Sequence, residues 1–184
     1  MVSLLSLWLP VLVATIIVYL AGFIMNMVLP HHRGDFAPIT DEDGFSNTIR
    51  SQELAPGQYH FPFAETPEQM KDPAWIEKLN NGPVGLLLIV GNGNRMPRQL
   101  ALQLAHMLAI TIFAAYIGSA TLPAGVEYLK VFQVVGATAF LGYAGALFPY
   151  SIWHGFSCTH TWKTAFDGLV YGLLTAGVFG WLWP

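Results

Sequence analysis

Charged residues are scarce in this chain of 184 residues. Asp, Glu, Lys and Arg make up only 10% of the sequence, whereas hydrophobic residues make up 54%. A soluble domain of this size carries about 25% charged residues, so the deficit predicts a protein whose main solvent is lipid. The net charge of -3 includes no basic excess, which argues against a nucleic-acid-binding protein.

Cysteine is nearly absent as well. Cys158 is the only one, which excludes an intrachain disulfide framework. The glycine-rich stretch 91–94 matches neither the nucleotide phosphate-loop pattern nor the dinucleotide-binding pattern. No Ser/His/Asp arrangement and no pair of carboxylates at a useful spacing can be identified. These absences favour a noncatalytic protein over an enzyme.

Long apolar runs are abundant, and they predict a mainly α protein, a four-helix polytopic membrane bundle. A helix of about 20 residues crosses a hydrocarbon core ~30 Å thick. The first transmembrane helix is expected within residues 1–30, and its apolar run exceeds the roughly 7–15 residues of a signal-peptide core, which predicts a retained span. Residues 99–184 are expected to form the other three spans, at 99–122, 126–150 and 164–183.

Between the first and second spans, residues 31–98 have a different composition. They hold six of the eight Lys and Arg residues and nine of the eleven Asp and Glu residues. We therefore predict a small aqueous α+β insertion that leans on the membrane domain, because its own core is small. The expected elements are a helix capped by Thr40, an edge strand at 57–63, a helix from Thr66-Pro67 that restarts at Asp72-Pro73, and a buried strand at 84–90.

The positions of Lys and Arg predict the orientation in the membrane. If the insertion and the loop containing Lys163 face the cytoplasm, seven of the eight basic residues lie inside and only Lys130 lies outside. The insertion is therefore predicted to be cytoplasmic, with both termini on the outer side.

Small residues recur four apart along the last apolar segment. In lipid, small side chains let helix backbones approach closely, so we expect this stripe to pack against another helix. Trp181 and Trp183, which follow it, fit an interfacial belt. The stripe comprises Gly168, Gly172, Ala176 and Gly180.

Polar side chains inside the spans are functional candidates, because they are costly in hydrocarbon. Gln99, Gln103 and His106 share one face of the second span. His106 could serve a proton relay, a haem or a quinone, but we favour an interhelical hydrogen bond. Asp167 follows Thr164 at a capping-box spacing, which predicts that it lies in the first turn of the fourth helix.

Histidine and cysteine supply the candidate metal ligands. The predicted topology brings these residues to one face of the membrane, where imidazole and thiolate could form a tetrahedral site. Their spacing matches no established ligand signature, and histidines at a membrane boundary are commonly interfacial. The candidates are His31, His32, His154, Cys158 and His160, and the cofactor stays unassigned.

Several stretches together resemble a group of uncharacterised small bacterial integral membrane proteins. They are HHRGD after the first span, PGQYHFP in the insertion, SIW near the end of the third span, and the terminal DGLVYGLLTAGVFGWLWP. The resemblance extends in order over most of the chain. It implies a location in the bacterial inner membrane, and it implies no activity, cofactor or catalytic residue.

Two functional interpretations follow. The first is an accessory or assembly subunit of a larger membrane complex, with membrane lipid and other membrane subunits, or a second copy, as partners. The alternative is a membrane enzyme, transporter or redox subunit that uses His106 and the His/Cys cluster. The small-residue stripe and the lack of a reaction constellation favour the first.

Overall fold

The computed structural model describes residues 2–184, which fold into two compact units. Unit 1 comprises Met1–Asp35, Asn94–Ser151 and Phe156–Pro184, and unit 2 comprises Phe36–Gly93 with Ile152–Gly155. Helix predominates and the strand content is small, which confirms the predicted mainly α class.

Unit 1 is built from four apolar helical segments that are long enough to cross a membrane. This length and composition confirm four candidate spans. In chain order, the elements are η1 (Leu4–Leu7), α1 (Trp8–Phe23), η2 (Ile24–Val28), η3 (Pro30–His32), α4 (Met96–Thr121), α5 (Tyr128–Ala144), α6 (Leu147–His154) and α7 (Cys158–Leu182).

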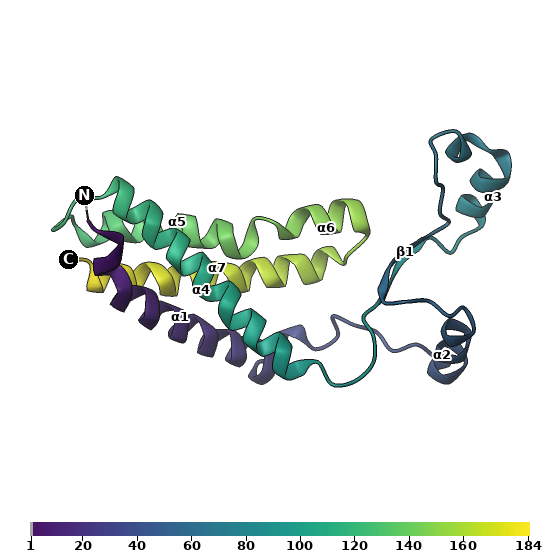
Figure 1. Ribbon diagram of the computed structural model, residues 1–184, viewed down its shortest axis with the longest axis horizontal. Helices are drawn as coiled ribbons and strands as arrows, with labels where there is room; N and C mark the ends of the chain where they lie inside the picture. Colours follow the sequence, from purple (N-terminus) through teal and green to yellow (C-terminus); the bar gives the residue numbers. More distant parts are fainter. Residues whose placement is uncertain (1) are drawn as a thin grey trace. The chain divides into compact units, whose positions relative to one another are not determined.

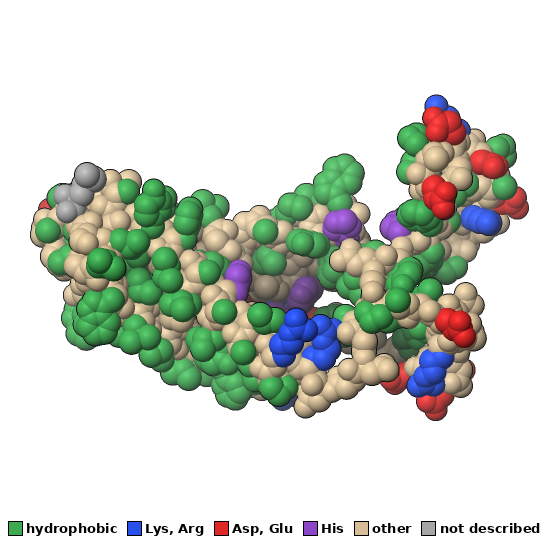
Figure 2. Space-filling view, in the orientation of Figure 1, with side chains coloured by type: hydrophobic (Ala, Val, Ile, Leu, Met, Phe, Trp, Pro, Cys, Tyr) green, Lys and Arg blue, Asp and Glu red, His purple; other side chains and the backbone are tan. Residues whose placement is uncertain are grey.

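The long helices of unit 1 run side by side and form a closed ring of contacts (Figure 1). α7 packs against α5 and α1, and α4 packs against the same two helices. The bundle surface seen in Figure 2 is covered mainly by hydrophobic side chains. Such a surface suits lipid, because lipid imposes no cost on exposed apolar groups.

The α5–α7 contact is the most extensive of these, and the small-residue stripe of α7 lies in it. A Cβ atom added at Gly172 would lie 3.2 Å from the Cα of Phe140, and one added at Gly168 would lie 3.0 Å from the Cβ of Ala144. The stripe is therefore covered by a helix of the same chain, and the two backbones approach closely because Cβ atoms are missing.

The carboxyl end of the chain closes one end of the bundle. The indole Nε1 of Trp183 donates a hydrogen bond of 3.0 Å to the carbonyl oxygen of Pro123, in the turn between α4 and α5. The backbone N–H of Gly125, at a φ of +70°, donates to the carbonyl oxygen of Pro184 over 2.7 Å. The hydrogen bond of Trp183 thus stabilises the turn between α4 and α5. Trp181, in contrast, is 77% exposed.

Two helix ends differ from the predicted span boundaries. The helical segment continues past Pro149, because Pro149 is the third residue of α6, where its missing N–H interrupts no helical hydrogen bond. The fourth helix begins at Cys158 instead of residue 164, with Ser157 as its cap. The predicted loop at 151–163 therefore shrinks to the three residues between α6 and α7.

Unit 2 contains two short α-helices and one two-stranded antiparallel sheet. Its elements are α2 (Glu42–Ser51), β1 (Gly57–Phe61), η4 (Gln69–Lys71), α3 (Pro73–Asn81) and β2 (Gly85–Ile89). The two strands pair antiparallel, with Gly57 opposite Ile89 and Phe61 opposite Gly85. Charged side chains are concentrated on this unit (Figure 2).

Three local predictions for unit 2 need correction. Asp41, not Thr40, caps α2, because its carboxylate accepts a hydrogen bond of 2.9 Å from the N–H of Gly44. No α-helix begins at Thr66, and α3 starts after Asp72, whose carboxylate accepts from the N–H of Ala74. The strand predicted to be buried is half-exposed, because a two-stranded sheet leaves both strands at an edge.

We expect Gly172→Leu to destabilise the bundle, because its side chain would meet the α5 backbone. Overpacking of this kind costs about 1–3 kcal/mol. Gly177→Leu is the matched control on the same helix, since a Cβ there meets only the hydroxyl oxygen of Tyr128, at 3.7 Å. Thermal unfolding in detergent measures both variants. Equal melting temperatures for the two variants would contradict the assigned packing face.

Candidate functional site

The segment after the first apolar helix carries two adjacent histidines that turn toward α7. Pro30–His32 form a single 3-10 turn, in which the N–H of Arg33 donates to the carbonyl oxygen of Pro30. Gly34 follows with a φ of +88°, a conformation that suits glycine. This turn brings the side chain of Asp35 back toward His32.

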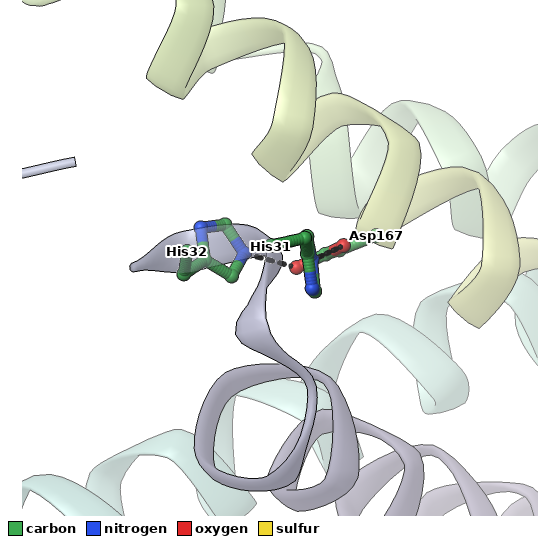
Figure 3. A group of neighbouring side chains, drawn as sticks. All are labelled: His31, His32 and Asp167. Carbon is green, nitrogen blue, oxygen red and sulfur yellow. Dashed lines mark hydrogen bonds and ion pairs between the residues drawn. The ribbon is translucent and has the colours of Figure 1, made fainter. Parts of the chain in front are cut away.

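Asp167 is the acceptor that both histidines reach (Figure 3). The Nε2 atom of His31 lies 3.0 Å from Asp167 Oδ1, and the Nε2 atom of His32 lies 2.8 Å from Oδ2. Asp167 is only 2% exposed, so its carboxylate needs these partners. The predicted capping role is wrong, because Asp167 lies in the third turn of α7.

Asp35 extends the network on its other side. Its Oδ2 atom lies 2.6 Å from His32 Nδ1 and 2.7 Å from His160 Nδ1, and its Oδ1 atom accepts from Lys163 Nζ over 2.5 Å. His160, Lys163 and Asp167 occupy one face of α7, because their spacing of three and then four residues follows the helical repeat. The two carboxylates are therefore joined through His32.

The contacts of this network shift the pKa values of Asp35 and His32. The hydrogen bond from Lys163, followed by those from His32 and His160, keeps the pKa of Asp35 well below its ordinary value of 3.8. Burial opposes protonation of His32, but hydrogen bonds and attraction from Asp167 and Asp35 outweigh it and raise its pKa above 6.5. Both shifts follow from the hydrogen bonds of this network.

Two overlapping sets of side chains in this network have the composition of a metal site. His31, His32 and Asp167 form one, and His32, Asp35 and His160 form the other; within each set the ligand atoms lie within 4.8 Å of one another. Imidazole nitrogen and carboxylate oxygen are ligands of divalent transition metals. The Nδ1 atom of His31 is buried and has no hydrogen-bond partner among the described residues.

The structure separates the five histidine and cysteine candidates. His31, His32 and His160 lie in the network, whereas His154 and Cys158 belong to neither set of possible ligands among residues 2–184. Cys158 is exposed, and His154 lies at the end of α6. The expected thiolate ligand is therefore replaced by carboxylates, the ligand type that the sequence reasoning missed.

A cleft of about 440 Å³ adjoins the network and is lined by residues of α1, η2, α4, α5 and α7 and by the start of α6. Gln103, His106 and Asp167, which the sequence identified separately, all line it. Asn26 also lines it, and its side-chain amide donates to the carbonyl oxygen of Gly22. The cleft thus combines apolar walls with a few hydrogen-bonding groups, the usual composition of a small-molecule site.

The interhelical hydrogen bond favoured for His106 is not formed. His106 is exposed in the cleft and makes no hydrogen bond or ion pair within the described part of the chain. Its side chain faces the cleft, where no acceptor is close enough. The Gln103–His106 face therefore borders an opening and does not fix the helix packing.

Unit 2 presents a second candidate surface. None of the residues 36–93 is buried, although the unit contains many large apolar side chains. Exposed fractions are, for example, 68% for Phe63, 52% for Met70, 51% for Val84 and 46% for Leu88. An isolated pair of strands is marginally stable in water, and exposed apolar side chains of this number make unit 2 a candidate interaction surface.

Comparison of the chain with protein-family models, curated proteins and solved structures finds no match. The site is therefore interpreted from its own geometry.

We expect Asp167→Asn to lower the free energy of unfolding by about 1.5–3 kcal/mol, the usual worth of hydrogen bonds to a charged group. The amide keeps the shape of the carboxylate but loses the charge that attracts His31 and His32. Glu127→Gln is the charge-matched control, because Glu127 makes no capping hydrogen bond at the start of α5. Chemical unfolding in detergent measures both, and a loss no greater than that of the control would show that the network does not hold α7.

Proposed function

We propose that this chain is a noncatalytic accessory or assembly subunit of a larger complex in the bacterial inner membrane. The proposed orientation places unit 2 in the cytoplasm and both termini outside, as the distribution of Lys and Arg favours. In this proposal unit 1 anchors the chain in lipid, and unit 2 binds a neighbouring subunit.

The observation that carries the proposal is the lack of a core in unit 2. Folding stabilises a domain mainly by removing apolar surface from water, and residues 36–93 bury none of their side chains fully. Phe63, Val84 and Leu88 are each large and about half-exposed or more. A surface on a partner would remove these groups from water and stabilise the unit at the same time.

The net charge of unit 2 indicates which chemical class of partner it would bind. Residues 36–93 contain eight Asp and Glu against three Lys and Arg, a net charge of -5. Anionic lipid headgroups would repel such a unit, and so would the same unit of a second copy. A protein surface that combines basic and apolar side chains fits both the charge and the exposed groups.

The test is purification of the full-length chain from its native membrane in mild detergent, followed by native mass spectrometry. A photo-crosslinker at Met70 identifies what contacts unit 2. We expect crosslinks to one stoichiometric foreign subunit, at a segment rich in Lys and Arg, with binding that weakens as the salt concentration rises.

Substitutions separate this surface from general effects on the membrane domain. We expect Phe63→Ala, Val84→Ala and Leu88→Ala together to release the partner at least ~10-fold more readily, because hot-spot residues each contribute more than about 1 kcal/mol. The control triple is Leu20→Ala, Leu129→Ala and Leu141→Ala, at equally exposed positions of the bundle. Crosslinks only to unit 1, only to a second copy or only to lipid would refute the proposal.

A second candidate function, a membrane enzyme, transporter or redox subunit, is favoured by the cleft that gathers Gln103, His106 and Asp167. In this interpretation a small molecule enters the cleft and meets these polar groups. A purified chain that carries a bound pigment or a small molecule, with no foreign subunit, would favour it.

A further inference from the structure

We propose that His31, His32 and Asp167 bind one divalent transition-metal ion of the Zn²⁺ class. This site is independent of the partner proposed for unit 2, because all three ligands lie in unit 1.

The three side chains already converge. The two Nε2 atoms face different oxygens of one carboxylate, at 3.0 Å and 2.8 Å (Figure 3). Two imidazoles and one carboxylate are a set that binds Zn²⁺ or Fe²⁺ and leaves a position open for water or another ligand. Hard cations such as Ca²⁺ and Mg²⁺ prefer oxygen ligands alone, so the two nitrogens select a transition metal.

Asp35 supplies the outer support that metal-bound histidines require. A metal-ligating imidazole usually donates its second N–H to a carboxylate, which fixes the tautomer. His32 Nδ1 lies 2.6 Å from Asp35 Oδ2, so the N–H at Nδ1 can donate to Asp35 while Nε2 turns its lone pair to the metal. Asp35 is held in place by His160 and Lys163.

Lys163 excludes the alternative set of ligands. A cation bound by His32, Asp35 and His160 would share the Asp35 carboxylate with the ammonium group of Lys163, which lies 2.5 Å from Oδ1. Two positive charges at one carboxylate repel each other. Asp167 has no Lys or Arg partner in the described chain, since its side-chain hydrogen bonds go to His31 and His32.

Charge balance also favours a cation beside Asp167. This carboxylate is buried on a helix that could cross a membrane, where an uncompensated negative charge is costly. A divalent cation bound between His31, His32 and Asp167 supplies opposite charge directly to this carboxylate.

The test is Co²⁺ and Zn²⁺ binding to the full-length chain in detergent after treatment with a chelator. We expect one Co²⁺ per chain with a visible absorption band, which Zn²⁺ displaces. His31→Ala should weaken binding at least ~10-fold, and Asp35→Asn should weaken it by about 10–100-fold, as is usual for loss of an outer partner.

Matched variants distinguish the two possible sets of metal ligands. His31 and His160 are both partly exposed, and each contacts only one of the two acids. Retained binding in His160→Ala together with loss in His31→Ala supports the site. The opposite result, or equal binding in both, overturns it. His60→Ala, His106→Ala and Cys158→Ser are controls that should bind normally, and circular dichroism and gel filtration check that each variant is folded.

A measurement on the unaltered chain covers the case in which a variant does not fold. Zn²⁺ should protect His31 and His32 from diethyl pyrocarbonate, as mapped by mass spectrometry, and should leave His60 and His106 reactive. Failure to bind Co²⁺ or Zn²⁺ stoichiometrically, with no protection of His31 and His32, would refute the metal site. Neither result bears on the partner of unit 2, which the crosslinks test separately.

Discussion

The buried carboxylate of Asp167 is the constraint around which one end of the bundle is arranged. A charge on an apolar helix must find opposite charge or hydrogen-bond donors, because neither lipid nor a packed interior solvates it. The segment Pro30–Asp35 supplies the donors, and this pins the end of the first apolar helix against α7. The position of the two histidines against α7 follows from this charge, whereas α1 and α7 also share an apolar cluster that includes Val18 and Tyr171.

The close approach of α5 and α7 rests on different physics. Hydrophobic burial does not drive apolar helices together in lipid, so their contact depends on shape and dispersion. Gly168 and Gly172 let the α5 backbone come near enough for many such contacts. Among the described residues, unit 2 has no comparable helix–helix contact. It consists of one two-stranded sheet and two short helices, and many of its large apolar side chains are exposed.

The sequence predicted the parts of the fold that follow from local patterns. Long apolar runs identify the four helices, and the aromatic content of residues 57–63 locates β1. The start of α7 was predicted too far along the chain, because Thr164 and Asp167 match a capping box. The residue that caps α7 is Ser157. The network could not be derived, since His32 and Asp167 are 135 residues apart. Its local signals were the spacing of His160, Lys163 and Asp167 along one helix face and the three-residue spacing of His32 and Asp35.

The two roles of α7 depend on this helix start. Successive residues of an α-helix point about 100° apart, as follows from 3.6 residues per turn. Gly168 faces α5, so the preceding Asp167 is directed away from α5 and toward the segment that carries His31 and His32. Because α7 begins at Cys158, His160 and Lys163 share the face of Asp167 and reach Asp35. A helix that began at residue 164 would carry the stripe but not this polar face, and the network would lose two of its six members, His160 and Lys163.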